Sequence, residues 1–421
     1  MKQDEHFTGN LSQDPLQLSH QCMAPSSVRT SGESCSPAIT QSTASHSLQV
    51  IRVDSSRLHR EFCDFPWQLY HDDPYWVAPV RSLERQRWTL KYNSSLRNRW
   101  AQRFIVTRNE RIVGRVAVMI DPEFSKRWNA NSGFFGFFEC ENDPEASMLL
   151  LRTAEQTLKT HGITRILGPV NLTTHDEVGL LVSGQESRPM VLSPYQLDYY
   201  ESLLLANDYS ARCEYHAYSW STAHVTDQRA QRFLARYAGS ASSAGIVLRA
   251  STPGHWKTET VILHELYNEC FSDVWGFVPI AWDEFLERAQ SFKPFYHPEL
   301  VVFAYKGNQP IGFALVLPDI NEALAQINGR LFPLGWLRLM FAIRRIQSAR
   351  FVLLGVLPEY RNTGIALRLA HQVALAAQRM GILRAELSLI NETNEQVQRI
   401  VRAFGGQRIK TYRLFEKELS Q

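Results

Sequence analysis

Two stretches of the chain share one pattern of apolar and polar positions. Residues 103–121 (RFIVTRNERIVGRVAVMID) and residues 300–319 (LVVFAYKGNQPIGFALVLPD) each contain two apolar runs rich in β-branched and aromatic residues. A short polar turn separates the two runs, so each stretch predicts a β-hairpin. A glycine and an aspartate follow the turn at equal spacing in both stretches, which indicates an internal repeat: Gly114 with Asp121, and Gly312 with Asp319.

A second pair of segments repeats in the same order. Residues 161–170 (HGITRILGPV) and residues 380–389 (MGILRAELSL) each follow an amphipathic helical pattern, and each carries a glycine suited to end a helix before a buried strand. Two matches in one order favour a tandem duplication. Each half reads as strand, helices, hairpin, strand, helix, strand, helix, strand. That order predicts an α/β fold with a mixed (α+β) sheet and helices on both faces.

The composition changes along the chain suggest its boundaries. We expect a first domain at residues 48–225 and a second at residues 246–421. Between them, residues 238–245 (AGSASSAG) consist of small residues typical of a loop. Residues 1–47 are rich in Ser, Thr and Gln and contain no continuous apolar stretch. Such a segment buries too little apolar area to offset its ordering entropy, so we predict that it is disordered.

The second half contains a motif suited to binding an anion. The continuous apolar run from Phe351 to Val356 predicts a strand that is buried on both faces, and Pro358 ends it. A helix with one apolar face then begins near Gly364. Free N–H groups and the positive end of the helix dipole favour an anionic ligand at such a helix start, and small residues let that ligand approach the backbone. A pyrophosphate fits this pattern.

The segment V-x-P-x-Y-R-x-x-G-x-A, residues 356–366, resembles the acetyl-CoA signature of the GCN5-related N-acetyltransferase (GNAT) superfamily. The resemblance continues through INETNEQVQRIVRAFGGQRIKTYRLFEKEL, which is similar to the closing strand, helix and hairpin of that family, and it covers about residues 246–419. The whole chain also resembles long bacterial tandem-GNAT proteins. These resemblances imply that acyl-CoA or acetyl-CoA is the co-substrate.

The resemblance also implies roles for individual residues. The backbone of Val356 would hydrogen-bond the pantetheine arm, and Asn394 would lie beside that arm. The pyrophosphate would lie in a cradle formed by Arg361, Asn362, Thr363, Gly364, Ile365 and Ala366. Two of these assignments have a structural alternative. Arg361 also fits an ordinary surface cation, and Asn394 also fits a plain helix N-cap.

The first half lacks this apparatus. Its corresponding strand, SGFFGFFEC, is followed by ENDPEAS, in which acidic residues stand where a basic residue and glycines would be needed. Carboxylates beside a pyrophosphate would repel it. We therefore expect the first half to be a degenerate copy that supports the second half or shapes an acceptor pocket. Residues 171–177 (NLTTHDE) follow its predicted buried strand and suit either a turn or a substrate-contacting loop.

Two residues that perform acid–base chemistry in many members of the family are absent from this sequence. Acyl transfer to an amine requires a base for the amine and an acid for the leaving thiolate. Many members of the family have a tyrosine seven residues after the conserved asparagine, but here that position is Val401. The fourth strand of the second half also lacks the glutamate that often relays a proton. Both departures leave the mechanism open.

Three residues are substitute catalytic candidates. Glu386 lies on one face of a predicted strand and suits either a base or a salt bridge. Tyr412, in the predicted terminal hairpin, suits either an acid or a packed sheet tyrosine. Asp273 follows a helix in the part of the family fold that lines the acceptor site, and it also suits a loop residue at a helix end.

Residues 331–346 are nearly continuous in large apolar residues. Arg338 and Arg345 fall on one helical stripe, and a basic stripe on a helix with Trp and Phe is typical of a segment in a membrane interface. A buried helix packed against the first half is the alternative.

The overall composition removes several other functional classes. The formal net charge of +3 gives no basic field for nucleic acid, and no apolar run reaches transmembrane length. The six cysteines lack metal-ligand or C-x-x-C spacing, and the histidines form no H-x-x-x-H pattern, so we expect no metal site. We also see no signal peptide. A cytoplasmic protein, free or peripheral to the inner membrane, fits this composition.

These observations define the expected function. The resemblance implies a CoA-dependent N-acyltransferase that moves an acetyl or longer acyl group to a small-molecule or lipid amine. One alternative is long-chain N-acylation of an amino lipid such as a sphingoid base at a membrane surface. Another is a catalytically silent acyl-CoA-binding scaffold. A tandem aminoacyl transferase that uses tRNA is disfavoured by the CoA motif and the balanced charge.

Overall fold

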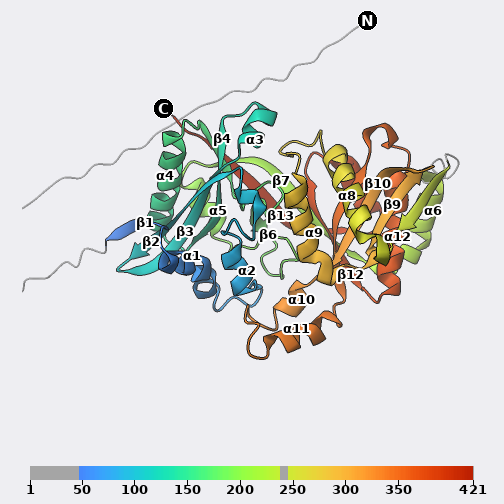
Figure 1. Ribbon diagram of the computed structural model, residues 1–421, viewed down its shortest axis with the longest axis horizontal. Coiled ribbons are helices and arrows are strands. Elements are labelled where there is room, and N and C mark those ends of the chain that lie inside the picture. The colour runs from blue at the N-terminus through green and yellow to red at the C-terminus, as the bar shows by residue number, and fades with distance from the viewer. Residues whose placement is uncertain (1–46, 238–244, 421) are drawn as a thin grey trace, which may run out of the picture. The chain divides into compact units, whose positions relative to one another are not determined.

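The computed structural model describes residues 47–237 and 245–420 (Figure 1). The predicted disordered segment lies outside the described residues except for Ser47, and the predicted loop at 238–245 does so except for Gly245.

Both halves contain the expected elements in the expected order, with additional short helices after each hairpin and one additional strand in the first half. The first half comprises β1 (Leu48–Arg52), α1 (Ser56–Leu69), α2 (Arg81–Gln86), η1 (Ser94–Leu96), β2 (Trp100–Arg108), β3 (Arg111–Ile120), α3 (Pro122–Trp128), β4 (Ser132–Cys140), α4 (Pro144–Thr160), β5 (Arg165–Gly168), β6 (Leu180–Ser183), α5 (Tyr200–Leu205), β7 (Ser210–Ser221), η2 (Thr222–Thr226) and α6 (Gln228–Tyr237). The second half begins with β8 (Ile246–Ala250), η3 (Pro253–His255), α8 (Trp256–Cys270), α9 (Trp282–Phe292), η4 (Lys293–Phe295), η5 (Pro298–Leu300), β9 (Val301–Lys306) and β10 (Gln309–Pro318). It continues with α10 (Asn321–Leu324), α11 (Gly335–Ile343), β11 (Ser348–Val356), η6 (Pro358–Tyr360), α12 (Ile365–Arg379), β12 (Arg384–Asn391), α13 (Glu395–Ala403) and β13 (Gln407–Glu418).

The two predicted hairpins are present as β2–β3 and β9–β10. At the first turn, Asn109 and Glu110 both have positive φ angles, of 51° and 64°, which suits the twist of a two-residue hairpin turn. The repeated aspartates both end their hairpins. The Asp121 carboxylate accepts from two backbone N–H groups at the start of α3, and the Asp319 carboxylate accepts from Asn321 at the start of α10.

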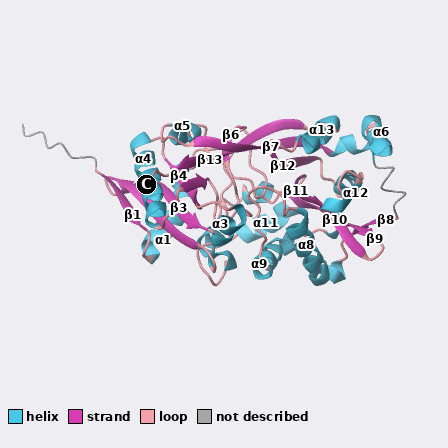
Figure 2. Ribbon diagram, turned by 90° about the horizontal axis from the view of Figure 1, so that it is seen from above, coloured by secondary structure: helices cyan, strands magenta, loops and turns pink. Residues whose placement is uncertain are grey.

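The strands of both halves form one continuous mixed sheet in the order β1-β2-β3-β4-β5-β13-β7-β12-β11-β10-β9-β8, and β6 lies off this path and pairs with β13. The closing strands of the halves are exchanged. β13, the last strand of the chain, pairs with β5 of the first half, while β7 of the first half pairs with β12 of the second. β13 is continuous from Gln407 to Glu418, so the terminal hairpin predicted around Tyr412 is wrong. Figure 2 shows α8 and α9 on one face of the sheet and α13 on the other.

The exchange gives the halves a shared core. The α4 helix packs its buried face, which includes Leu150 and Leu158, on the β2–β3 hairpin, and α12 packs in the same way over β9–β11. A third apolar cluster combines first-half residues such as Phe62 with Val278 from the α8–α9 connection and Leu414 from β13. The two halves therefore do not bury their apolar surfaces independently.

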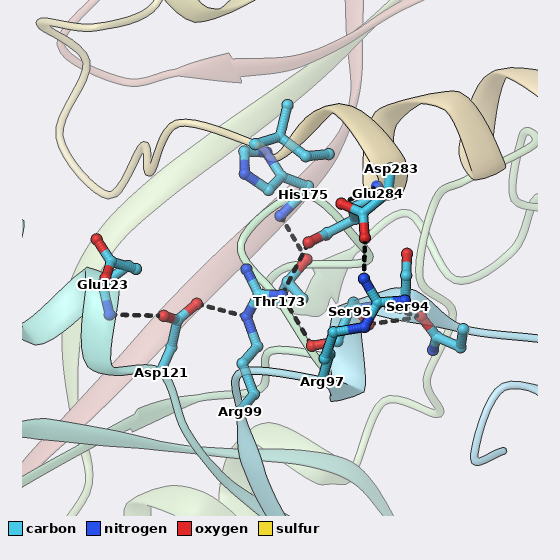
Figure 3. Close-up of polar contacts among 12 residues, drawn as sticks. Ser94, Ser95, Arg97, Arg99, Asp121, Glu123, Thr173, His175, Asp283 and Glu284 are labelled. Carbon is cyan, nitrogen blue, oxygen red and sulfur yellow. Dashed lines mark hydrogen bonds and ion pairs between the residues drawn. The ribbon is translucent and has the colours of Figure 1, made fainter. Parts of the chain in front are cut away.

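Arg99 links the halves through buried charges (Figure 3). Its Nε donates to Asp121 at 2.6 Å, and its Nη1 donates to Glu284 of α9 at 2.8 Å. The three side chains are 11%, 6% and 7% exposed. Burial opposes the charged form of the guanidinium, but the two carboxylates outweigh it and raise the pKa of Arg99 above its usual value.

Removing the guanidinium should strongly destabilise the fold. The Arg99→Ala variant leaves the buried Asp121 carboxylate without its cationic partner and leaves Glu284 with Arg288 alone, which costs about 3–5 kcal/mol of unfolding free energy. Arg97→Ala is the matched control. It breaks an ion pair with Asp283 in which both side chains are about half exposed, so a loss of less than about 1 kcal/mol is expected. Urea unfolding of both variants measures the difference, and equal losses would contradict the bridging role of Arg99.

Candidate active site

The parallel strands β11 and β12 diverge at the centre of the second half. Their pairing runs from Ser348 with Arg384 to Phe351 with Leu387, and it stops there although β11 continues to Val356. Beyond Phe351, the edge of β11 that faces β12 therefore has no strand partner. Unpaired backbone N–H and C=O groups at such an edge are available to an extended ligand.

The loop after β11 leads directly into the start of α12. Gly364 is the N-cap of that helix and has a φ of 82°, a left-handed conformation that glycine adopts without steric cost. No side chain caps the helix, and its first backbone bond runs from Arg368 N–H to the Gly364 carbonyl. The N–H groups of the first turn therefore remain available to an anion. The Gln396 side chain donates to Asn362 Oδ1 at 3.1 Å and ties this loop to α13.

Arg361 and Asp273 form an ion pair beside this loop. The Arg361 Nη2 donates to Asp273 Oδ1 at 3.0 Å and to the Cys270 carbonyl at 2.8 Å. The hydrogen bond from Arg361 lowers the pKa of the Asp273 carboxyl, which makes it a weaker base. This geometry supports an anchoring role for Asp273, and its catalytic role remains a prediction. The roles of Val356 and the loop residues in CoA binding also remain predictions.

Asn394 caps α13, because its side chain accepts from the Val397 backbone N–H at 3.2 Å. This contact matches the N-cap alternative, and the role beside pantetheine stays a prediction. Val401 is buried, 5% exposed, and packs against Tyr218 and Ile390. No hydroxyl is therefore available at the position where many relatives carry a tyrosine.

In the first half, side chains occupy both the helix start and the gap between strands that correspond to the open positions of the second half. Asp143 caps α4 by accepting from the N–H groups of Glu145 and Ala146, so a carboxylate occupies the helix start that an anion would need. The strands β4 and β5 also diverge after Phe134. Asn171 fills that gap, since its Oδ1 accepts from the Phe137 N–H at 2.6 Å. These contacts explain physically why this copy lacks a nucleotide cradle.

Glu386 and Tyr412 lie in the interior. Glu386 is 1% exposed and accepts from Ser388 Oγ at 2.7 Å, and the Lys410 ammonium of β13 lies 3.9 Å away. Tyr412 is fully buried in an apolar cluster with Tyr70. Burial, and then the nearby Glu386 charge, raises the pKa of the Tyr412 phenol. The structure does not bring these two residues together with Asp273, which lies beside the CoA loop, and their catalytic roles remain untested predictions.

Comparisons with known proteins agree with this geometry. A family model described as the acetyltransferase (GNAT) family matches residues 261–405. The chain is 32% identical over 379 residues to a protein named bacterial ceramide synthase from Caulobacter vibrioides (strain NA1000 / CB15N), an alignment that covers 88% of this chain and 98% of the relative.

The chain belongs to the GNAT superfamily. It is also 29% identical over 366 residues to Protein YghO of Escherichia coli (strain K12), covering 86% of this chain and 93% of that relative. Among solved structures, a tandem GNAT protein from the clavulanic acid biosynthesis pathway matches with a TM-score of 0.52 at 12% identity and covers 89% of this chain and 99% of that chain. At that identity the likeness shows the fold alone. The predicted tandem GNAT architecture with a mixed α/β sheet is confirmed.

An apolar pocket lies on the α8–α9 face of the second GNAT half. Its walls come from α8, α9, β10 and β11, with side chains such as Leu263, Phe285 and Ala289. It reaches Val352 and Leu353, the first residues of β11 beyond its pairing with β12. The pocket thus opens where the GNAT strands diverge, and sequence analysis did not predict it.

The segment NLTTHDE of the first half packs against this pocket. The Arg288 side chain of α9 bonds Asp176 at 2.6 Å and Thr173 at 3.2 Å. The His175 backbone N–H donates to Thr173 Oγ1 (Figure 3). The segment forms a turn, as one of its two interpretations predicted. His175 lines the pocket together with Tyr267 of α8. Sequence analysis missed this pair, although the cluster of polar residues after a buried strand did mark the segment.

The α11 region exposes a group of large apolar side chains. Exposed fractions are 82% for Phe332 and 49% for Trp336, and the group also contains Leu334, Met340 and Phe341. These values contradict the buried-helix alternative, although Ala342 is buried on the opposite side of the helix. Arg330, Arg338, Arg344 and Arg345 are exposed around the same group. No helix in the described ranges is long and apolar enough to cross a membrane, and these ranges contain no His, Cys, Asp and Glu cluster suited to a metal.

Proposed function

We propose that this GNAT protein transfers a long acyl chain from acyl-CoA to the primary amine of a long-chain amino lipid, as in N-acylation of a sphingoid base. The observation that carries the proposal is the apolar pocket that opens at the divergence of β11 and β12. The relative named bacterial ceramide synthase, which aligns over nearly its whole length, supports the same acceptor class.

The second half has the features that acyl-CoA binding needs. The uncapped start of α12 and Gly364 suit the pyrophosphate, and the free edge of β11 up to Val356 suits the pantetheine amides. In the reaction the amine nitrogen attacks the thioester carbonyl carbon. The C–N bond forms, the C–S bond breaks, and the proton lost by nitrogen ends on the leaving sulfur of CoA.

The position of the pocket supports a role in binding the acceptor. It lies beneath α8 and α9, the first helical pair of this half, which in GNAT proteins borders the acceptor site. Its lining is apolar along most of its length, with Leu263 from α8, Phe285 from α9 and Leu315 from β10. Each methylene buried in such a lining contributes about 0.8 kcal/mol, so an alkyl chain of a dozen carbons gains far more from this pocket than a small polar amine does.

The α11 surface supplies a second supporting observation. Its exposed side chains pair Trp336 and Phe341 with flanking Arg338 and Arg345, and this arrangement suits a helix that lies in the interface of an anionic bilayer. Both substrates of the proposed reaction have long chains and partition into membranes. A protein that docks on the bilayer through α11 would meet them there.

Reversing two charges on α11 should weaken membrane binding. Each basic residue near an anionic surface contributes about 1 kcal/mol, so Arg338→Glu with Arg345→Glu should lower the affinity for phosphatidylglycerol vesicles at least tenfold. Sedimentation at low and high salt measures the change. The double variant Arg57→Glu with Arg379→Glu alters two exposed arginines elsewhere by the same net charge and should bind normally. Equal loss in both variants, or no vesicle binding by the unaltered protein, would contradict docking through α11.

The proposed reaction is tested by following free CoA thiol. With palmitoyl-CoA, the protein should release thiol only when an amine is added, and sphinganine should support faster release than serinol, which carries the same amino-diol head without the chain.

One observation favours a second function, a catalytically silent acyl-CoA-binding protein, because Val401 replaces the usual proton donor. Tight binding of palmitoyl-CoA without thiol release for any amine would favour that function.

A further inference from the structure

We propose that His175, supplied by the first half, is the proton acceptor for the amine in the reaction of the second half, with Tyr267 as its positioning residue. This inference rests on the proposed function and extends it. It gives the degenerate half a chemical role.

The position of the pair is the first observation. His175 and Tyr267 both line the apolar pocket that reaches Val352 and Leu353 of β11. Both also line a second pocket, which reaches Leu389 of β12. These strand residues lie just beyond the last paired positions of β11 and β12. The pair therefore lines both pockets, close to the strand residues beside which a thioester bound along β11 and its attacking amine would meet.

The hydrogen bonding of the imidazole is the second observation. The Nδ1 atom lies 2.9 Å from the Tyr267 hydroxyl. The Nε2 atom is buried and has no hydrogen-bond partner among residues 47–237 and 245–420. A buried polar atom without a partner carries a desolvation cost, and a substrate hydrogen would remove that cost. When Nδ1 donates its hydrogen to the tyrosine oxygen, Nε2 presents a lone pair.

The surroundings of the ring fix its place and its charge. On α9, Arg288 donates to the His175 carbonyl and to Asp176, and Glu284 lies beside Arg288. Phe277 packs edge-on against the ring, with centroids 5.5 Å apart. Burial, followed by the Arg288 charge, lowers the pKa of His175 to about 4; Asp176 and Glu284 raise it, and the more distant Arg99 lowers it further. The imidazole is therefore neutral throughout the physiological pH range, and its Nε2 keeps a free lone pair.

The proton balance of the step is complete with this one group. As the C–N bond forms, the attacking nitrogen becomes acidic and gives its proton to His175 Nε2. As the C–S bond breaks, the imidazolium returns that proton to the sulfur. The products are an amide and the CoA thiol, and His175 is again neutral. Tyr267 holds the ring through Nδ1 and does not contact the reacting atoms.

The variant His175→Asn separates catalysis from packing. The asparagine side chain keeps a polar atom near the position of Nδ1, within reach of Tyr267, but has none at Nε2. With palmitoyl-CoA and sphinganine, kcat should fall at least about 100-fold, the usual contribution of a general base, while KM for palmitoyl-CoA stays within about twofold. Tyr267→Phe keeps Nε2 and loosens the ring, so kcat should fall about tenfold or less.

A rescue experiment gives a readout that a purely structural role would not move. In His175→Ala, added imidazole should restore part of the lost kcat, and the same concentration should leave the unaltered protein unchanged. If His175→Asn retains full kcat while the unaltered protein turns over, His175 is not the base and the proposed function stands. If the unaltered protein makes no amide, the proposed function fails and this assignment fails with it. A fall in CoA affinity equal to the fall in kcat would show that His175 only supports the fold.

Discussion

Replacing Gly364 with glutamate is expected to abolish CoA binding while the protein remains folded. Gly364 has a φ of 82° at the N-cap of α12, where a side chain is strained and would occupy the space that a pyrophosphate needs. The carboxylate would also cap the free N–H groups and repel the phosphates, as Asp143 does at the corresponding helix of the first half. We expect the Kd for CoA to rise more than about 100-fold, the effect of about 3 kcal/mol, in a calorimetric titration.

The opposite end of the same helix offers a matched control. Gly381 has a φ of 80° just past the C-terminus of α12, and a side chain there would meet nothing within 4 Å. Gly381→Glu therefore introduces the same charge and a similar backbone strain on the same helix. It should leave CoA binding within about twofold of the unaltered protein, since no phosphate site lies at a helix C-terminus. Equal affinities for CoA in the unaltered protein and both variants would contradict the CoA-binding role of the loop at Gly364.

The second large effect concerns the length of the acceptor. Ala289 of α9 is a small side chain in the wall of the apolar pocket, opposite residues of β10 such as Leu315. In Ala289→Trp the indole would fill part of the space proposed for the alkyl chain. Excluding four methylenes costs about 3 kcal/mol at about 0.8 kcal/mol each, so kcat/KM for sphinganine should fall about 100-fold.

The short acceptor distinguishes this effect from general damage. Serinol has no chain to exclude, so its kcat/KM should change less than about threefold in Ala289→Trp. Ala281→Trp places the same side chain at the exposed N-cap of α9, outside the pocket lining, and should leave both acceptors unaffected. Equal losses for sphinganine and serinol would mean that the indole disturbs the reaction centre, and no loss for either would mean that the chain binds elsewhere.

Local patterns in the sequence predicted the parts of the fold that local physics determines. The two hairpins follow from apolar runs around short turns, and the open start of α12 follows from a glycine placed between a strand and an amphipathic helix. The loss of the cradle in the first half was also predictable, because Asp143 stands where an anion would bind. In each case the decisive residues lie close together in the chain.

The exchange of β7 and β13 was not predictable in the same way. The apolar pattern of Gln407–Glu418 suits a strand whichever neighbour it pairs with, and the terminal hairpin was expected only from the resemblance to the family. The pairing with β5 links residues such as Phe415 and Gly168, which are far apart in the chain. The same limit applies to Glu386. Its place in the strand pattern predicted that Glu386 lies on one face of a strand, but the ammonium of Lys410 reaches it only through the exchanged strand.

The proposed catalytic pair was hidden for the same reason. His175 and Tyr267 lie 92 residues apart, in different halves, and neither belongs to a recognisable motif. Only the polar cluster around His175 gave a signal. For α11, the sequence predicted the combination of apolar and basic residues, but burial and exposure on a short helix depend on what packs against it. The exposure of Phe332 and Trp336 contradicts the buried-helix alternative, and the membrane-interface role stays a proposal.

The central claim, long-chain acyl transfer to an amino lipid, is tested most directly by identifying the product. The purified protein would be incubated with palmitoyl-CoA and sphinganine in anionic vesicles, and the lipids would be analysed by mass spectrometry while free CoA is measured. The account predicts N-palmitoylsphinganine and CoA in equal amounts, and much slower product formation from acetyl-CoA. Rapid acetylation of small amines, with no N-palmitoylsphinganine formed, would contradict it.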